Sequence, residues 1–155
     1  MDRFDAMTDA DGMSSASSSA SHDHIEPLAR DECIRRLEAR GVGRLGVETH
    51  GGVGIFPVNY VVDGDSIVVR VRRDGVLDEG TDGTVVAVEI DEADSMYHEG
   101  WSVLVQGHCV HVRDADEIGA LDRLPLLPWG GSDRDLYIRV SMELVTGRHI
   151  HHRAV

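Results

Sequence analysis

Residues 54–73 read GIFPVNYVVDGDSIVVRVRR, two apolar segments joined by a short polar link. Valine, isoleucine and aromatic residues favour strands, and the Asp63-Gly64-Asp65 link is typical of a tight hairpin turn. The second segment ends with three arginines within four positions, Arg70, Arg72 and Arg73. The stretch therefore predicts a β-hairpin with a cluster of positive charge at the end of its second strand.

The charge of the whole chain makes this cluster unusual. Its 155 residues include 28 acidic and 15 basic side chains, a formal net charge of −13, and every basic one is arginine. So acidic a chain is repelled by a phosphodiester backbone, and we expect no nucleic-acid partner. A local arginine group suits a small phosphate, because the planar guanidinium makes paired hydrogen bonds to phosphate oxygens. The alternative is that these arginines solvate the strand end and pair with Asp74 and Asp78.

One domain is expected after an N-terminal tail. Residues 1–26 are rich in serine and acidic side chains and poor in large apolar ones, so we expect a disordered tail followed by a domain over residues 27–152. We find no secretory signal and no apolar run of the roughly 18 residues that a membrane span needs, and we expect a cytoplasmic protein. Cys33 and Cys109 have no CxxC spacing and are expected to be free, buried thiols.

Strands dominate the predicted domain. A helix is predicted over residues 28–40, and strands over both hairpin segments and over residues 42–48, 84–90, 101–112 and 136–141. Polar loops are predicted over 72–83 and 91–99, and a second helix over 114–124 with Asp114 as its cap. Pro57 removes a backbone donor, so its strand must be an edge or bulged there. The pattern indicates a mostly β fold, a closed or nearly closed six-stranded barrel with flanking helices, whose uncovered edges favour a homodimer.

Motifs for catalysis by side chains are absent from the sequence. We find no GxSxG, no P-loop, no dinucleotide-binding glycine pattern and no HExxH, and therefore predict no catalytic residue and no metal ligand. His149, His151 and His152 could bind a metal or a haem, although a solvated tail is the preferred interpretation. Trp101, beside Gly100, fits either core packing or a contact with a flat ligand ring.

Five segments occur in an order that resembles a known family. They are DECIRRL (31–37), VGRLG (42–46), PVNY (57–60), EGWSVLVQG (99–107) and TGR (146–148). In this order and spacing they resemble the pyridoxamine 5'-phosphate oxidase-like family of flavin-binding split barrels, nearest to its actinobacterial branch of nitroimidazole-resistance-type proteins. The resemblance covers about residues 28–150.

This resemblance implies a six-stranded split-barrel homodimer with two flavin mononucleotide (FMN) sites at the subunit interface. The positions that would line the isoalloxazine ring and ribityl chain are Pro57, Val58, Asn59 and Tyr60. The positions that would face the phosphate are Arg70, Val71, Arg72 and Arg73. Trp101 and Ser102 would reach the same cofactor from the partner subunit.

The phosphate loop departs from the family pattern. Family members commonly carry a G-S-K-L loop whose lysine helps to hold the phosphate, whereas that position is Val76 here, so the arginine cluster would hold the phosphate largely unaided. The chain also lacks the C-terminal arginine segment of true pyridoxamine phosphate oxidases, and the vitamin B6 reaction is not expected.

The leading hypothesis is an FMN-dependent oxidoreductase that acts with a small-molecule substrate or electron donor, the cofactor supplying the chemistry. The alternatives are a deazaflavin cofactor, a flavin- or haem-binding sensor without turnover, and a dimeric scaffold that has lost its cofactor.

Overall fold

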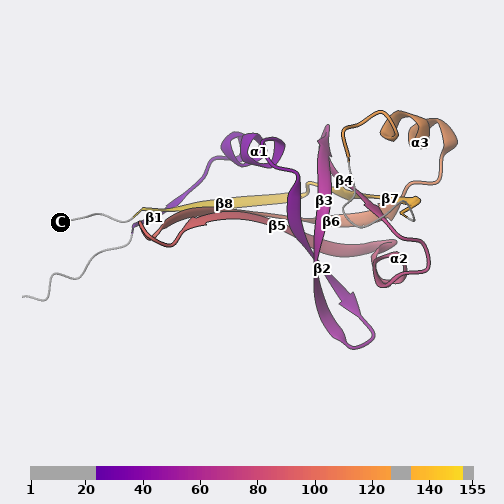
Figure 1. Cartoon of the computed structure of the whole chain (residues 1–155), viewed down its shortest axis with the longest axis horizontal. Coiled ribbons are helices and arrows are strands. Elements are labelled where there is room, and N and C mark those ends of the chain that lie inside the picture. Colours follow the sequence, from indigo (N-terminus) through magenta and orange to yellow (C-terminus); the bar gives the residue numbers. More distant parts are fainter. Residues whose placement is uncertain (1–23, 127–133, 152–155) are drawn as a thin grey trace, which may run out of the picture.

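The strands of the domain all pair antiparallel with their neighbours. The computed structural model describes residues 24–126 and 134–151 (Figure 1). Its elements in chain order are β1 (His24–Pro27), α1 (Arg30–Glu38), β2 (Val42–Thr49), β3 (Gly52–Asp63), β4 (Ser66–Val71), α2 (Val76–Thr81), β5 (Thr84–Asp94), β6 (Glu99–His111), α3 (Ala115–Leu121), β7 (Leu136–Ser141) and β8 (Leu144–His151). Within these residues, no helix is long and apolar enough to cross a membrane.

A barrel forms because β6 pairs with β5 along one edge and, along its other edge, with β7, the last strand of the order. The sheet runs β1-β8-β6-β5-β2-β3-β4-β7, and a further pairing of β7 with β6 closes the ring β6-β5-β2-β3-β4-β7. Among the described residues this ring has six strands, with β8 and β1 outside it. The predicted mostly β fold, a six-stranded split barrel with flanking helices, is confirmed.

The barrel splits from the rest of the sheet at Gly107. On one side of β6, residues 100–106 pair with β8, whereas residues 109–111 pair with β7. A Cβ at Gly107 would lie 1.8 Å from the carbonyl oxygen of Ser141, the last residue of β7. Glycine is therefore required where β6 changes its partner, because any side chain would collide with the β7 backbone.

The extended part of the sheet, which we call the wing, consists of β1 and β8 with residues 90–94 of β5 and 99–106 of β6. Figure 1 shows it as the long ribbons that run away from the barrel, with α1 lying over one face. Cys33 and Leu37 are the buried residues of α1. A Cβ at Gly147 of β8 would lie 2.5 Å from the Cys33 sulfur, so this glycine allows the helix to approach closely.

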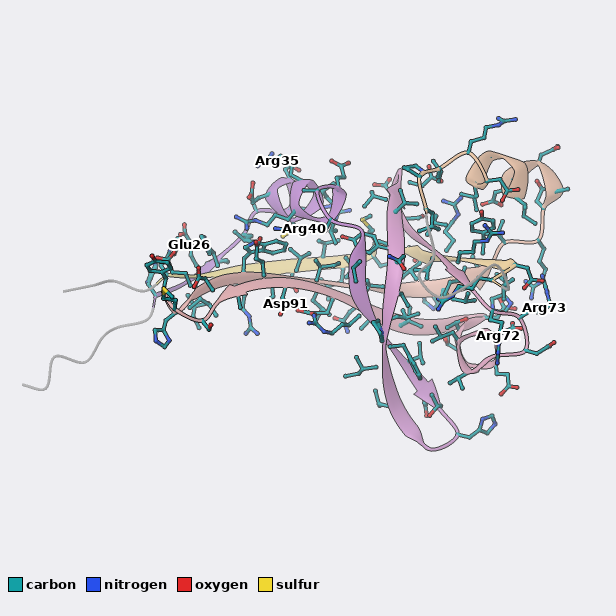
Figure 2. All side chains as sticks on the ribbon, in the orientation of Figure 1. Glu26, Arg35, Arg40, Arg72, Arg73 and Asp91 are labelled. Carbon is teal, nitrogen blue, oxygen red and sulfur yellow. The ribbon has the colours of Figure 1, made fainter. Side chains whose placement is uncertain are left out.

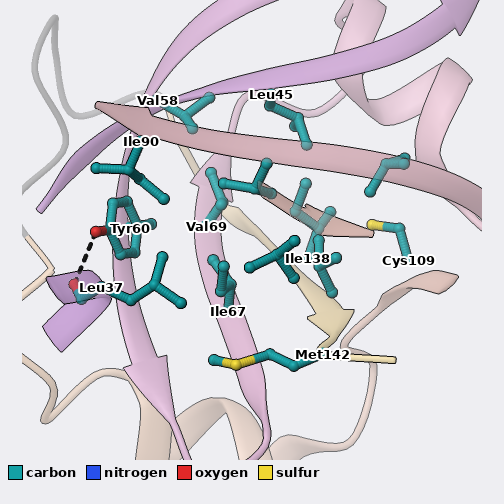
Figure 3. Packing of buried hydrophobic residues seen from close by; sticks show 14 of the residues in the cluster. Leu37, Leu45, Val58, Tyr60, Ile67, Val69, Ile90, Cys109, Ile138 and Met142 are labelled. Atoms are coloured by element: carbon teal, nitrogen blue, oxygen red, sulfur yellow. Dashed lines mark hydrogen bonds between the residues drawn. The ribbon is translucent and has the colours of Figure 1, made fainter. Parts of the chain in front are cut away.

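The barrel interior holds the main hydrophobic core (Figure 3). Leu45, Ile67, Val69 and Ile138 are fully buried there. Each such side chain stabilises the fold by about 1.5–3 kcal/mol relative to exposure. A smaller cluster outside the barrel contains Val68, Val112, Leu121, Leu126 and Tyr137. Because β4 contributes side chains to both clusters, both of its faces are covered.

The hairpin and the helix boundaries follow the sequence pattern closely. Pro57 pairs with Arg44 of β2, and β4 pairs with β3 only over Tyr60–Asp63, so Pro57 lies where β3 is an edge, as predicted. The Asp114 carboxylate accepts a hydrogen bond from the Glu117 backbone N–H at 2.9 Å, which confirms the predicted cap of α3.

Four elements differ from the prediction. Helix α2 lies within the segment 72–83 that was predicted as a polar loop, and β5 and β6 extend into the predicted acidic loop 91–99. Strand β8 was not predicted, because its largely exposed Thr, Arg and His residues carry little hydrophobic pattern. It is held instead by its pairing with β6.

The first strand of the structure begins at His24, three residues before the predicted start of the domain. Residues 1–23 of the predicted tail lie outside the described residues, and its last three residues, His24–Glu26, belong to strand β1, which pairs with β8. Both cysteines are free and buried, as predicted. Burial raises the pKa of the Cys109 thiol to about 12.

Candidate functional site

A cavity of about 310 Å³ lies where β4 ends and the chain turns into α2. It is lined by Phe56, Val71, Arg72, Gly75, Val76, Leu77 and Arg134, and we call it the Arg72 pocket. Phe56 and Leu77 also pack against the barrel core, so its floor is apolar and anchored. The turn before α2 is held by the Asp74 backbone N–H, which donates to the Asp78 carboxylate at 2.7 Å. The pocket thus combines an apolar floor with guanidinium groups.

The three predicted arginines do not converge on this pocket. Arg72 lines it, whereas Arg73 pairs with Asp135, with 3.2 Å between its Nε and a carboxylate oxygen. This hydrogen bond from Arg73 holds the pKa of Asp135 below its ordinary value. Arg70 lies over the Tyr137 ring, with its guanidinium carbon 5.2 Å from the ring centroid. Its Nε is buried without a hydrogen-bond partner among the described residues.

The predicted alternative, pairing of these arginines with Asp74 and Asp78, is not seen in the described residues. Asp78 instead faces His111, at 3.5 Å from its Nδ1, and Asp135 is the acid that neutralises Arg73. The arginine cluster is therefore divided among three different surroundings.

The segment Pro57–Tyr60 alternates between the two faces of β3. Val58 and Tyr60 lie in the barrel interior, each 3% exposed, and the Tyr60 hydroxyl donates to the Leu37 carbonyl at 2.7 Å (Figure 3). Burial of Tyr60 raises the pKa of its hydroxyl. Pro57 and Asn59 fall on the outer face of the strand. Only the outer pair can offer side chains to a ligand outside the barrel, while Val58 and Tyr60 can offer backbone atoms.

Trp101 and Ser102 lie in the wing. The Trp101 Nε1–H donates to Glu92 at 3.2 Å, and Arg36 of α1 lies 4.8 Å from the ring centroid. Arg40 also lies over this ring, at 5.9 Å, and pairs with the same Glu92. The Ser102 hydroxyl accepts a hydrogen bond from Arg148 at 3.2 Å.

Within one chain, the predicted site residues of the wing lie far from those at the end of β4. Figure 2 shows Arg40 above the wing and Arg72 with Arg73 beside α2, at the far side of the barrel. Within a single chain, Trp101 and Ser102 therefore do not share a pocket with Arg72.

Two of the C-terminal histidines, His149 and His151, lie against each other with their ring planes tilted by 52°. The His149 and His151 ring centroids are 3.8 Å apart, and His151 lies 3.4 Å from the Glu26 carboxylate. His152 lies outside the described residues. The described part of the chain has no group of three or more histidine, cysteine or carboxylate ligands placed to hold a metal ion.

Comparison with known proteins identifies the family. Residues 29–149 match the family model described as pyridoxamine 5'-phosphate oxidase. The chain belongs to this family. An uncharacterized protein of Mycobacterium tuberculosis is 32% identical over 144 residues, which cover 90% of this chain and 93% of that protein.

Solved structures extend the similarity of this family member. The FAD binding protein from Mycobacterium smegmatis is 29% identical, with a TM-score of 0.70 over 81% of this chain and 98% of that one. A proposed 5-nitroimidazole antibiotic resistance protein from Bacteroides thetaiotaomicron has a TM-score of 0.65 over 86% of this chain and 94% of its own, but at 14% identity it shows the fold alone. The family resemblance seen in the sequence is confirmed.

Sequence reasoning missed the second arginine of the Arg72 pocket. Arg134 precedes β7 and lies far from the hairpin in sequence, so no local motif connects it with Arg72. The signal that could have found it is the antiparallel pairing of β4 with β7, in which Val71 lies opposite Leu136.

Proposed function

We propose that this protein binds a flavin, with the flavin phosphate in the Arg72 pocket, and acts as a flavin-dependent oxidoreductase. The observation that carries the proposal is the pocket itself, in which guanidinium groups meet an apolar floor on a chain of net charge −13. Arginine binds phosphate oxygens through paired, charge-assisted hydrogen bonds. Family membership and the similarity to a mycobacterial FAD binding protein support the same ligand class.

The residues that line the Arg72 pocket suit a phosphate group. Arg72 offers its guanidinium, and Gly75 lets a ligand approach the backbone because it has no side chain. Arg70 lies over the Tyr137 ring and does not line this pocket, so it is not part of the proposed phosphate site.

We further propose that two copies of the chain complete the site. Val53 and Ile55 are 80% and 68% exposed, and they share the outer face of β3 with Pro57 because residues two apart on a strand face the same way. A second copy that buries these side chains would also approach Pro57 and Asn59. Its Trp101 and Ser102 could then reach a flavin bound at Arg72, which a single chain does not allow.

The flavin, when bound, would supply hydride or electron transfer with a small-molecule substrate or electron donor. The chain would orient the ring along Pro57 and Asn59 and hold the phosphate at Arg72. We propose FMN as the cofactor, with FAD and deazaflavin as the alternatives of the same class and haem as one of another class. Catalysis would take place in the cytoplasm.

The visible absorbance spectrum of the purified protein tests this proposal. We expect the two-banded spectrum of an oxidised flavin, either as purified or after addition of FMN, FAD or a deazaflavin. A Soret band would indicate haem instead, and a colourless protein that binds none of these cofactors would contradict flavin binding.

Turnover and assembly need separate measurements. Bleaching of the bound flavin by a reduced nicotinamide, followed by reoxidation with an acceptor, would support an oxidoreductase. A flavin that no donor reduces would favour a binding or sensing module. Light scattering should give twice the chain mass of 17.0 kDa, and a monomer would contradict the shared site.

A further inference from the structure

We infer that Arg134 is a second phosphate-binding residue of the Arg72 pocket. It supplies a positive charge that the neighbouring Val76 does not. This inference rests on the proposed flavin function and names a residue that neither the hairpin nor its motifs contain. Arg72 and Arg134 both line the cavity, one after β4 and the other before β7.

Strand pairing explains why two distant arginines meet. β4 and β7 are antiparallel, with Val71 opposite Leu136 and Arg70 opposite Tyr137. The residues that follow Val71 and those that precede Leu136 therefore leave the sheet at the same end. The Arg73 backbone N–H and side chain both donate to Asp135, at 3.3 and 3.2 Å, and fix the two segments together. Arg134 is thereby held beside Arg72 by the sheet and not by a flexible loop alone.

The charge balance of the pocket favours an anion. Most arginines of the described chain are neutralised by carboxylates, as shown by the pairs Arg44–Asp91, Arg113–Asp82 and Arg139–Asp63. Arg72 and Arg134 form no ion pair with any described carboxylate, even though acidic residues outnumber arginines in the chain. Asp135, which follows Arg134 in the sequence, is already bound to Arg73. Among the described residues, two arginines thus line one cavity without a carboxylate paired to either.

This arrangement matches the phosphate of a flavin nucleotide. Val76 lines the same cavity and is 52% exposed, so it contributes apolar surface and no positive charge. Two arginine forks can each make paired hydrogen bonds to the oxygens of one phosphate, whereas a lysine offers a single point charge. The clamp should therefore favour phosphorylated flavins over riboflavin.

The test compares Arg134→Ala with wild-type protein for FMN, FAD and riboflavin, by quenching of flavin fluorescence. We expect Arg134→Ala to weaken FMN and FAD binding on the order of 10- to 100-fold, the usual effect of losing a hydrogen bond to a charged group, and to leave riboflavin binding unchanged. Arg134→Lys should recover part of the loss. Arg123→Ala, an exposed arginine after α3 that lies outside the cavity, is the control and should bind all three flavins like wild type.

Each outcome decides between this inference and the proposed function. Unchanged FMN affinity in Arg134→Ala, or an equal loss for riboflavin, would overturn the clamp while flavin binding stands. If the wild-type protein binds no flavin, the proposed function fails, and inorganic pyrophosphate becomes the probe, read by thermal unfolding. A pyrophosphate-dependent rise in Tm that Arg134→Ala and Arg72→Ala abolish would then support the clamp, and no rise in wild type would overturn it.

Discussion

His111 Nε2 lies 3.3 Å from Thr81 Oγ1, and this contact joins the end of α2 to the end of β6. Thr81 is fully buried, and its hydroxyl donates to the Leu77 carbonyl at 2.5 Å. On the other side of the ring, His111 Nδ1 faces Asp78 at 3.5 Å. Helix α2 has only six residues and depends on these polar contacts for its position. Because Val76 and Leu77 of α2 line the Arg72 pocket, the Thr81–His111 contact also positions one wall of the proposed site.

Replacing Thr81 with valine should destabilise the protein by about 1–2 kcal/mol. Valine keeps the shape of the side chain but leaves the buried Leu77 carbonyl and the His111 ring without the hydroxyl. Urea unfolding, followed by circular dichroism, would measure the change. The matched control is Thr146→Val on the exposed face of β8, which should stay within about 0.5 kcal/mol of wild type. Equal stability of both variants would show that the Thr81 hydroxyl does not hold α2.

Replacing Tyr60 with phenylalanine should lower stability by about 1–2 kcal/mol without weakening flavin binding. The ring stays in the core, and only the hydrogen bond to the Leu37 carbonyl is lost. Thermal unfolding and flavin titration of the same preparation give both values. Tyr97→Phe, at a position that is 63% exposed, should change neither. A large loss of flavin affinity with unchanged stability would instead place the Tyr60 hydroxyl at the ligand.

Replacing Gly107 with alanine should abolish folding or destabilise the protein by several kcal/mol. The new Cβ would lie 1.8 Å from the Ser141 carbonyl oxygen, and neither backbone can move without opening the barrel. Gly119→Ala in α3 is the control, because a Cβ there meets nothing within 4 Å. That variant should be as stable as wild type or more stable by about 0.5–1 kcal/mol, since alanine favours helices. A well-folded Gly107→Ala protein would contradict the partner change of β6 at this residue.

The sequence is most informative where hydrophobic pattern and turn chemistry agree. The hairpin around Asp63-Gly64-Asp65 and the Asp114 cap were predictable because each depends on residues close in sequence. Strand β8 was not, since its stability comes from hydrogen bonds to β6 rather than from its own apolar face.

The candidate site was predictable only in part for the same reason. Arg72 stands out as a charge at the end of an apolar strand, but the assignment of Arg73 to Asp135 and the approach of Arg134 depend on which strand pairs with β4. The inward direction of Val58 and Tyr60 follows from barrel closure. Local motifs cannot specify the partners of these arginines or the direction of these two side chains, because both arise from contacts between distant segments.

Glu143 should make stability depend on pH in acid. Its carboxylate accepts hydrogen bonds from the Ser141 hydroxyl at 2.7 Å and from the His108 backbone N–H at 3.1 Å, and these lower the pKa of Glu143 to about 2. A carboxyl group whose pKa is depressed in the folded state stabilises that state above its ordinary pKa of 4.5, and this contribution is lost as the pH falls toward 2. Glu143 therefore links β6 to the β7–β8 corner most strongly at neutral pH.

The variant Glu143→Gln should be less stable than wild type at pH 6, and the difference should shrink as the pH falls from about 5 toward 2, because the Glu143 carboxyl takes up a proton more readily in the unfolded chain than in the folded one. Urea unfolding midpoints at a series of pH values would measure this difference. Glu38→Gln, at an exposed position of α1, removes the same charge without these hydrogen bonds and should show no such trend. A difference that stays constant with pH would mean that the Glu143 side chain acts through its shape, because the ionised form gains more than the neutral one from the two donors at Ser141 and His108.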